Sequence, residues 1–223
     1  MPTSVTSPRR MVLLSMIVAG PVGCAGKAES PAPAATRYAP RIASTGQKTC
    51  FDSVGNVISC TGSGQDGELQ IGAAWPHPRF IANPDTTVTD AMTGLAWAPS
   101  GNVLAARDPK WEKMGTAFDG AVTWQHAFHY VAKLNAERYL GHDDWRLPNF
   151  KELASLLNYG EANSAAWLND QGFTRAQDMD YYWCSTSFPA NAVYAWAIDL
   201  KFGYVHRFKK THHHFVWPVR AGR

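Results

Sequence analysis

The sequence predicts an α+β domain in which two amphipathic helices precede a twisted antiparallel sheet. Two changes of periodicity support this prediction. Apolar residues recur at helical spacing over residues 122–139 and again over residues 149–160. Beyond residue 180 the pattern changes to alternation over short segments that are separated by turn residues. A pair of cysteines further predicts a disulfide hairpin at the start of the domain.

The chain begins with a predicted export signal over residues 1–23. Arg9 and Arg10 precede MVLLSMIVAGPVG, which is shorter than the ~20 residues needed to span a bilayer. The run ends at Gly23-Cys24, a junction typical of bacterial lipoproteins, so we expect Cys24 to be lipidated. A conventional cleaved signal followed by a coincidental cysteine is the alternative. We therefore expect a protein of the bacterial cell envelope, as an outer-membrane lipoprotein or otherwise periplasmic or secreted.

Residues 24–45 are predicted to be a tether. They are rich in Ala, Pro and Ser and cannot bury enough apolar surface to fold. The remaining residues, 46–223, suit one domain with one core. The membrane is thus expected to be a partner only through the lipid anchor.

Cys50 and Cys60 flank FDSVGNVIS, in which residues 54–56 provide a turn between two short arms. In an exported protein this pair predicts a disulfide that closes a small hairpin. The Gly-rich segment 61–72 follows. Its Asp66 and Glu68 carry oxygens of the kind that Ca²⁺ prefers, but the spacing is unlike an EF-hand and favours a turn-forming loop.

The elements of the domain follow in order. Residues 86–88 and 95–97 are predicted strands joined by a turn at 90–94. Thr123 is the expected N-cap of the first helix. Asn149 and Glu152 have the spacing of a capping box and predict the start of the second helix, with Gly160 as its stop. Strands are predicted at 181–186, 194–200, 204–208 and 215–220, and FKKTHHHF is predicted to form the turn between the last two.

Charge is unevenly distributed along the chain. The sequence has 21 Lys and Arg against 18 Asp and Glu, and two of the basic residues, Arg9 and Arg10, leave with the signal. The mature chain is therefore close to neutral, which argues against nucleic acid as a partner. Residues 201–223, in contrast, hold six cations and four histidines but no acid. This segment predicts a surface that attracts anions.

Four blocks of the sequence resemble the Lcl C-terminal domain family: HDDWRLPNFKEL, TVTDAMTGLAW, YYWCSTS and the terminal VWPVR. The resemblance runs from about Gly46 to Arg223. It implies a C-type-lectin-like fold, similar also to the formylglycine-generating enzymes. Each block also has a purely structural explanation, with Trp145 in the core and Arg146 paired to Asp143 or Asp144. The family usually has Ser at the position of Cys184, which we expect to be a buried, inert thiol.

The resemblance and the charge pattern together predict a non-catalytic, adhesin-like binding module. The namesake domain of the family binds sulfated glycosaminoglycans, so the expected partner is a sulfated or otherwise anionic glycan, with a surface protein as the alternative. The candidate ligand residues are Lys201, Tyr204, Arg207, Lys209, Lys210, His212 and His214.

Two alternatives belong to other classes of function. An enzyme like the formylglycine-generating relatives would need two reactive cysteines that coordinate copper, and only Cys184 is free after the assignments above. No cofactor is therefore expected. Weak metal binding is the second alternative, because His212 and His214 share one face of an extended segment while His213 points away. A structural zinc site needs four ligands, so no dedicated metal site is predicted.

Overall fold

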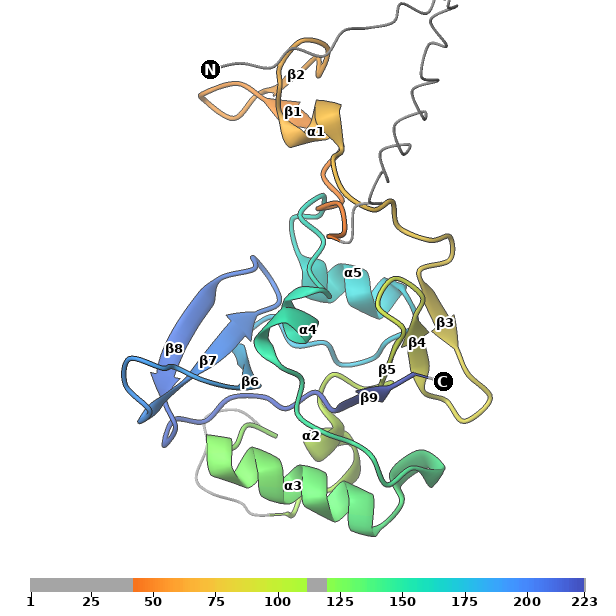
Figure 1. Cartoon of the computed structure of the whole chain (residues 1–223), viewed down its shortest axis with the longest axis vertical. Helices are drawn as coiled ribbons and strands as arrows, with labels where there is room; N and C mark the ends of the chain where they lie inside the picture. The colour runs from red at the N-terminus through yellow and green to blue at the C-terminus, as the bar shows by residue number, and fades with distance from the viewer. Residues whose placement is uncertain (1–41, 112–119, 223) are drawn as a thin grey trace, which may run out of the picture. The chain divides into compact units, whose positions relative to one another are not determined.

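Strand pairing divides the β structure into three antiparallel sheets within residues 42–111 and 120–222, which are the residues that the computed structural model describes (Figure 1). All of them fall in one compact unit of the chain. The mixed α+β class predicted from the sequence is confirmed. The strands, however, divide between two larger sheets and one small hairpin, whereas the sequence predicted one twisted sheet beside that hairpin.

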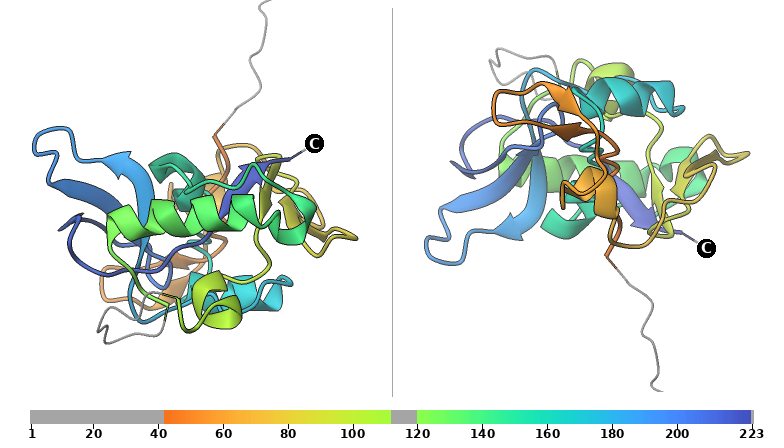
Figure 2. Two further views of the ribbon diagram at one scale, coloured as in Figure 1. Left: turned by 90° about the horizontal axis from the view of Figure 1, so that it is seen from below. Right: turned by 90° about the horizontal axis from the view of Figure 1, so that it is seen from above.

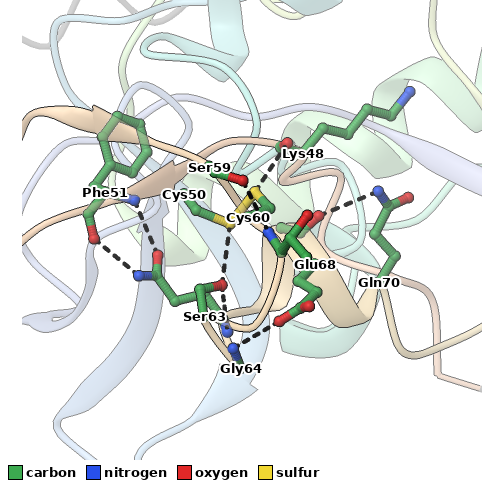
Figure 3. The surroundings of a disulfide bond; sticks show 12 residues. Lys48, Cys50, Phe51, Ser59, Cys60, Ser63, Gly64, Glu68 and Gln70 are labelled. Carbon is green, nitrogen blue, oxygen red and sulfur yellow. Dashed lines mark hydrogen bonds between the residues drawn. A yellow bond between two sulfur atoms is a disulfide. The ribbon is translucent and has the colours of Figure 1, made fainter.

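The small sheet is the predicted disulfide hairpin. Strands β1 (Cys50–Phe51) and β2 (Val57–Ile58) pair, and the short helix α1 (Asp66–Leu69) follows. Cys50 and Cys60 are bonded, as predicted. Figure 3 shows Glu68 beside the disulfide, where its carboxylate accepts the backbone N–H groups of Gly62 at 2.5 Å and Gly64 at 2.7 Å. This carboxylate therefore holds the Gly-rich loop closed.

The four-stranded sheet has the order β3-β4-β5-β9. Its strands are β3 (Phe80–Ala82), β4 (Val88–Asp90), β5 (Leu95–Trp97) and β9 (Val219–Ala221). The predicted turn at 90–94 is confirmed, because Gly94 donates its backbone N–H to the Asp90 carbonyl at 2.7 Å. The C-terminal strand thus closes a sheet that begins near residue 80, and both views of Figure 2 show it beside these strands.

The three-stranded sheet has the order β6-β7-β8, with β6 (Tyr181–Ser187), β7 (Tyr194–Asp199) and β8 (Val205–Lys209) close to their predicted positions. The predicted final strand at 215–220 begins too early, because β9 covers Val219–Ala221 and pairs with β5 of the other sheet. Residues Phe215, Val216 and Trp217 are buried, and Phe215 forms only an isolated bridge to Tyr182. This segment crosses between the sheets, because β8 belongs to the three-stranded sheet and β9 to the four-stranded sheet. FKKTHHHF is therefore a crossover and not the turn of a hairpin.

The helices are shorter than predicted. Helix α3 (Trp124–Ala136) begins at Thr123, whose side chain accepts from His126 N, as predicted. Helix α4 (Phe150–Ala154) has the predicted capping box but ends six residues before Gly160. It ends early because the chain turns to place Tyr159 against Thr45, with a backbone hydrogen bond of 2.9 Å. Helices α2 (Val103–Arg107) and α5 (Ser164–Asp170) and the 3-10 turn η1 (Tyr139–Gly141) were not predicted.

The ion pairs around Trp145 also differ from the prediction. Arg146 binds the Glu152 carboxylate through two hydrogen bonds of 2.6 and 2.7 Å. The expected partners lie elsewhere, since Asp144 pairs with Arg220 and Asp143 pairs with Arg138. Trp145 itself is buried as expected.

The core joins the two larger sheets through aromatic side chains. Trp217 packs edge-on against Trp97 of β5 and Phe173, and also contacts Tyr182 of β6. Its indole N–H donates to the Ala98 carbonyl at 2.9 Å, so the polar atom of this buried ring is satisfied. Helix α4 lies against β6 and β7. These contacts fix the β6-β7-β8 sheet, which carries the predicted ligand residues.

Candidate functional site

Strand geometry separates the predicted ligand residues into three groups. Side chains alternate between the two faces of a strand, so Arg207 and Lys209 of β8 share one face while His206 and Phe208 share the other. Lys201 and Tyr204 lie in the β7–β8 turn, at the end of the hairpin away from Lys209. The charge run that looks continuous in the sequence is therefore not one surface.

The first group forms what we call the cationic face: Arg207 and Lys209 with the aromatic residues Phe188, Tyr194 and Trp196. Arg207 is paired across the strands with Trp196, and Lys209 with Tyr194. The guanidinium lies 4.8 Å from the Phe188 ring centroid and 5.8 Å from that of Tyr194. Phe188 and Trp196 pack edge to face at 5.3 Å. Both cations are exposed.

Within the described part of the chain, no acid neutralises the cationic face. Neither Arg207 nor Lys209 forms an ion pair there, whereas other Lys and Arg side chains do. The aromatic rings hold Arg207 by cation–π contact, which leaves its outward N–H groups exposed to solvent. The arrangement offers two positive charges beside flat apolar surfaces.

The second group is a histidine cluster on the opposite face of the sheet. It consists of His206, His212 and His214 with Tyr181 and Phe208. The ring centroid of Phe208 lies 4.2 Å from that of His214, 4.7 Å from that of His206 and 5.9 Å from that of His212. His206 and His212 are exposed, but His214 is buried and its Nδ1 lies 3.1 Å from both carboxylate oxygens of Asp180. His214 is thus held in the protein and is not presented to a ligand.

His213 is half-buried and, among the described residues, takes no part in the ring contacts of this cluster. Burial lowers the pKa of His213, and the neighbouring His126, His214 and His212 lower it further. The imidazole therefore tends to stay neutral near pH 7. Among residues 42–111 and 120–222, no three His, Cys, Asp or Glu side chains are arranged to hold a metal ion.

The remaining candidates are engaged by neighbours. The Lys210 ammonium donates to Ser187 Oγ at 2.8 Å and lies 3.9 Å from the Trp124 ring centroid. Lys201 lies 3.7 Å from an Asp178 oxygen. Tyr204 is exposed and packs against Phe202. The sequence did not identify Phe188 and Trp196 as members of a binding surface. The alternation along β7 does place Tyr194 and Trp196 on one face of that strand.

A scan against protein-family models matches residues 86–220 to the Lcl C-terminal domain. The match covers more than half of the chain. The chain belongs to the Lcl C-terminal domain family. A search of the curated proteins returns no relative at a significant level of similarity.

The Lcl C-terminal domain includes the cationic face and the histidine cluster, whereas the disulfide hairpin precedes it. It also includes Cys184, which is buried, and burial raises the pKa of this thiol to about 12. Cys24 lies outside the described residues, as does the predicted signal. Within the described part, no helix is long and apolar enough to cross a bilayer. Residues 42–45, assigned to the tether from the sequence, hydrogen-bond to Ala73 and Trp75.

Proposed function

We propose that this protein is a non-catalytic binding module of the bacterial cell envelope that recognises a sulfated or otherwise anionic glycan through the cationic face. The observation that carries the proposal is the placement of Arg207 and Lys209 side by side, free of acids, beside Phe188, Tyr194 and Trp196. A surface protein that presents anionic groups is the alternative ligand.

The chemistry of the cationic face suits a sulfated sugar. A guanidinium donates paired N–H groups to the oxygens of a sulfate, and an ammonium adds a second charge. Arg207 is already held against Phe188 and Tyr194, so it loses less side-chain freedom on binding than an unrestrained arginine. The indole and phenol rings offer apolar surface for the C–H groups of a sugar ring.

Family membership supports the same function, since the namesake domain is part of an adhesin. We propose a C-type-lectin-like fold on the same ground, and the mixed α+β structure with antiparallel sheets is compatible with it. The analogy to formylglycine-generating enzymes is the weaker proposal. Cys184 is the free thiol of the described residues, and a buried thiol with a pKa near 12 stays protonated and is a poor nucleophile.

Charge reversal on the cationic face tests the proposal. We expect Arg207→Glu combined with Lys209→Glu to lower the affinity for a heparin octasaccharide by about tenfold or more, because two charge-assisted hydrogen bonds are replaced by repulsions. The measurement is calorimetric titration at two salt concentrations, with the parent binding more weakly at the higher one.

The control is Lys110→Glu combined with Lys151→Glu, which changes the net charge equally at exposed positions elsewhere. Equal weakening by both pairs would show that only net charge matters, and this would refute the assignment of the cationic face. We also expect Lys210→Glu to weaken binding less than Lys209→Glu, because Lys210 is already engaged by Ser187 and Trp124.

The proposed location in the cell envelope rests on the signal and on Cys24. We expect the full-length chain, expressed in a Gram-negative host, to sediment with the membranes, and Cys24→Ser to appear in the soluble periplasmic fraction or the medium. Metabolic labelling with a radioactive fatty acid is the direct measurement. Equal labelling of Cys24→Ser would show that the anchor is elsewhere.

A further inference from the structure

A cleft of about 450 Å³ lies between the segment that precedes the family match and the body of the domain. This volume is typical of small-molecule sites. Its walls come from residues 44–49, from α1, from residues 74–79, from the 158–161 turn and from α5. None of the residues of the cationic face lines it.

The wall of the cleft is held rigidly by close backbone approach. Gly46 has φ +88°, and a Cβ there would lie 2.3 Å from Asn158 Oδ1 and 2.9 Å from Trp75. Only glycine fits this position without displacement. The Thr45 carbonyl accepts from Tyr159 N, and the Trp75 indole donates to the Ser44 carbonyl, both at 2.9 Å. The two sides of the cleft are therefore tied to each other.

Arg79 lies in the wall of this cleft. Its side chain is 4 % exposed, with Nε and Nη2 bound to the Asp90 carboxylate at 3.1 and 3.0 Å. Nη2 also donates to the Ser155 carbonyl at 2.5 Å. No acceptor among the described residues reaches the buried Nη1. Nη1 also has almost no accessible surface, so a ligand in the cleft does not reach it, and Arg79 serves to hold the wall in place through Asp90 and Ser155.

The other groups of the cleft indicate the chemistry of a ligand. Trp75 and Trp167 lie 5.5 Å apart and form an aromatic wall, with the Arg79 guanidinium 4.4 Å from Trp75. The side-chain amides of Gln47 and Gln171 also line the cleft, and neither has a hydrogen-bond partner within the described residues. Amides both donate and accept, so they suit a ligand rich in hydroxyl groups.

Charge in the cleft does not favour an anion. The positive charge of Arg79 is neutralised by buried Asp90. The other charged lining residues are Lys48, Asp66 and Glu161, and the acids outnumber the lysine. Arg79 therefore brings no net charge to the cleft.

We infer that this cleft is a second binding site, distinct from the cationic face, that takes an uncharged sugar. One pyranose face lies on the aromatic wall of Trp75 and Trp167, and the hydroxyl groups of the sugar meet Gln47 and Gln171. The inference rests on none of the residues used for the anionic glycan. A peptide is the competing ligand class, and the cleft lacks the free strand edge that usually recognises one.

Titration of the mature domain with cellotriose, chitotriose and maltotriose tests the inference, followed by saturation-transfer NMR. We expect at least one trisaccharide to bind in the millimolar range or tighter. Gln47→Ala combined with Gln171→Ala is expected to weaken it about five- to tenfold, as two hydrogen bonds are lost. Thermal unfolding of this variant checks that it folds as the parent does.

The matched control is Gln125→Ala, an exposed glutamine on α3 outside the cleft, which should bind as the parent does. Arg207→Glu with Lys209→Glu should also leave trisaccharide binding unchanged. The two proposed sites can therefore be tested, and refuted, independently of each other. The inference is overturned if no trisaccharide binds, if the glutamine pair binds it as tightly as the parent, or if trialanine binds while the sugars do not.

Discussion

Glu152 uses its carboxylate for two tasks at the start of α4. One oxygen accepts from Arg146 at 2.6 Å and from Asn149 N at 2.8 Å, and the other accepts from Arg146 at 2.7 Å. Burial opposes its ionisation, but these hydrogen bonds outweigh burial and lower the pKa of Glu152 from its ordinary value near 4.5. A single carboxylate thus caps the helix and fixes the arginine of the DWRLP block.

We expect Glu152→Gln to lower the free energy of unfolding by about 0.5–1 kcal/mol at pH 7, because the amide still accepts from Asn149 N but the partly exposed ion pair with Arg146 is lost. Because the folded-state pKa is depressed, this contribution is present above the unfolded pKa and disappears as pH falls through the folded pKa. Parent and variant should therefore converge below about pH 4. Urea unfolding at several pH values measures this, with Lys151→Gln on the same helix as the control.

Local signals in the sequence predict caps well but ion-pair partners poorly. Asn149 and Glu152 are three residues apart, and helix geometry alone brings them together. Arg146 was expected to pair with Asp143 or Asp144, yet a side chain of this length reaches several carboxylates. Asp144 instead meets Arg220, 76 positions away. Only the packing of β9 against this segment decides between the candidates.

The disulfide hairpin is an element that gains little from a core. Strands β1 and β2 are two residues each, and Val54, Val57 and Ile58 are exposed. A two-stranded hairpin of this size is marginal in water by itself. The Cys50–Cys60 bond and the Glu68 contacts to the Gly-rich loop therefore carry most of its stability.

Replacing both cysteines, Cys50→Ser with Cys60→Ser, should destabilise this element by about 2–3 kcal/mol, since the bond closes a loop of about ten residues. We expect faster amide hydrogen exchange over residues 50–69 and unchanged exchange in β6 and β7. The same measurement on the parent under reducing conditions should give the same pattern. Uniform acceleration throughout the domain would contradict the local role.

The sequence predicted elements where a local signal was sufficient. Alternation located β6, β7 and β8, and the Thr123 cap located α3. Helix α5 was missed because its residues lie in a segment rich in Asn and Asp, although Asn163 does cap it. The end of α4 depends on contacts with residues 44–46, which no local pattern contains. For the candidate site, the charge run was visible, but the division of its residues between strand faces required the register of β7 against β8.

At the scale of the molecule, long-range contacts complete the structure. Strand β9 pairs with β5, and the Trp217 indole binds the Ala98 carbonyl, 119 positions earlier in the chain. Arg79 likewise joins β4 to the end of α4 through Asp90 and Ser155. The two proposed sites lie in different parts of the domain. One is on the β6-β7-β8 sheet, and the other is between residues 44–49 and α5.

The pairing of β9 with β5 has a consequence for the order of events during synthesis. A ribosome releases the chain from its N-terminus, so β3, β4 and β5 emerge long before the strand that completes their sheet. Trp97 and Phe173 also have to wait for Trp217 before their shared core can form. The last few residues therefore act as the closing step. Until β9 is present, the chain lacks both the last strand of this sheet and the ring that joins the two larger sheets.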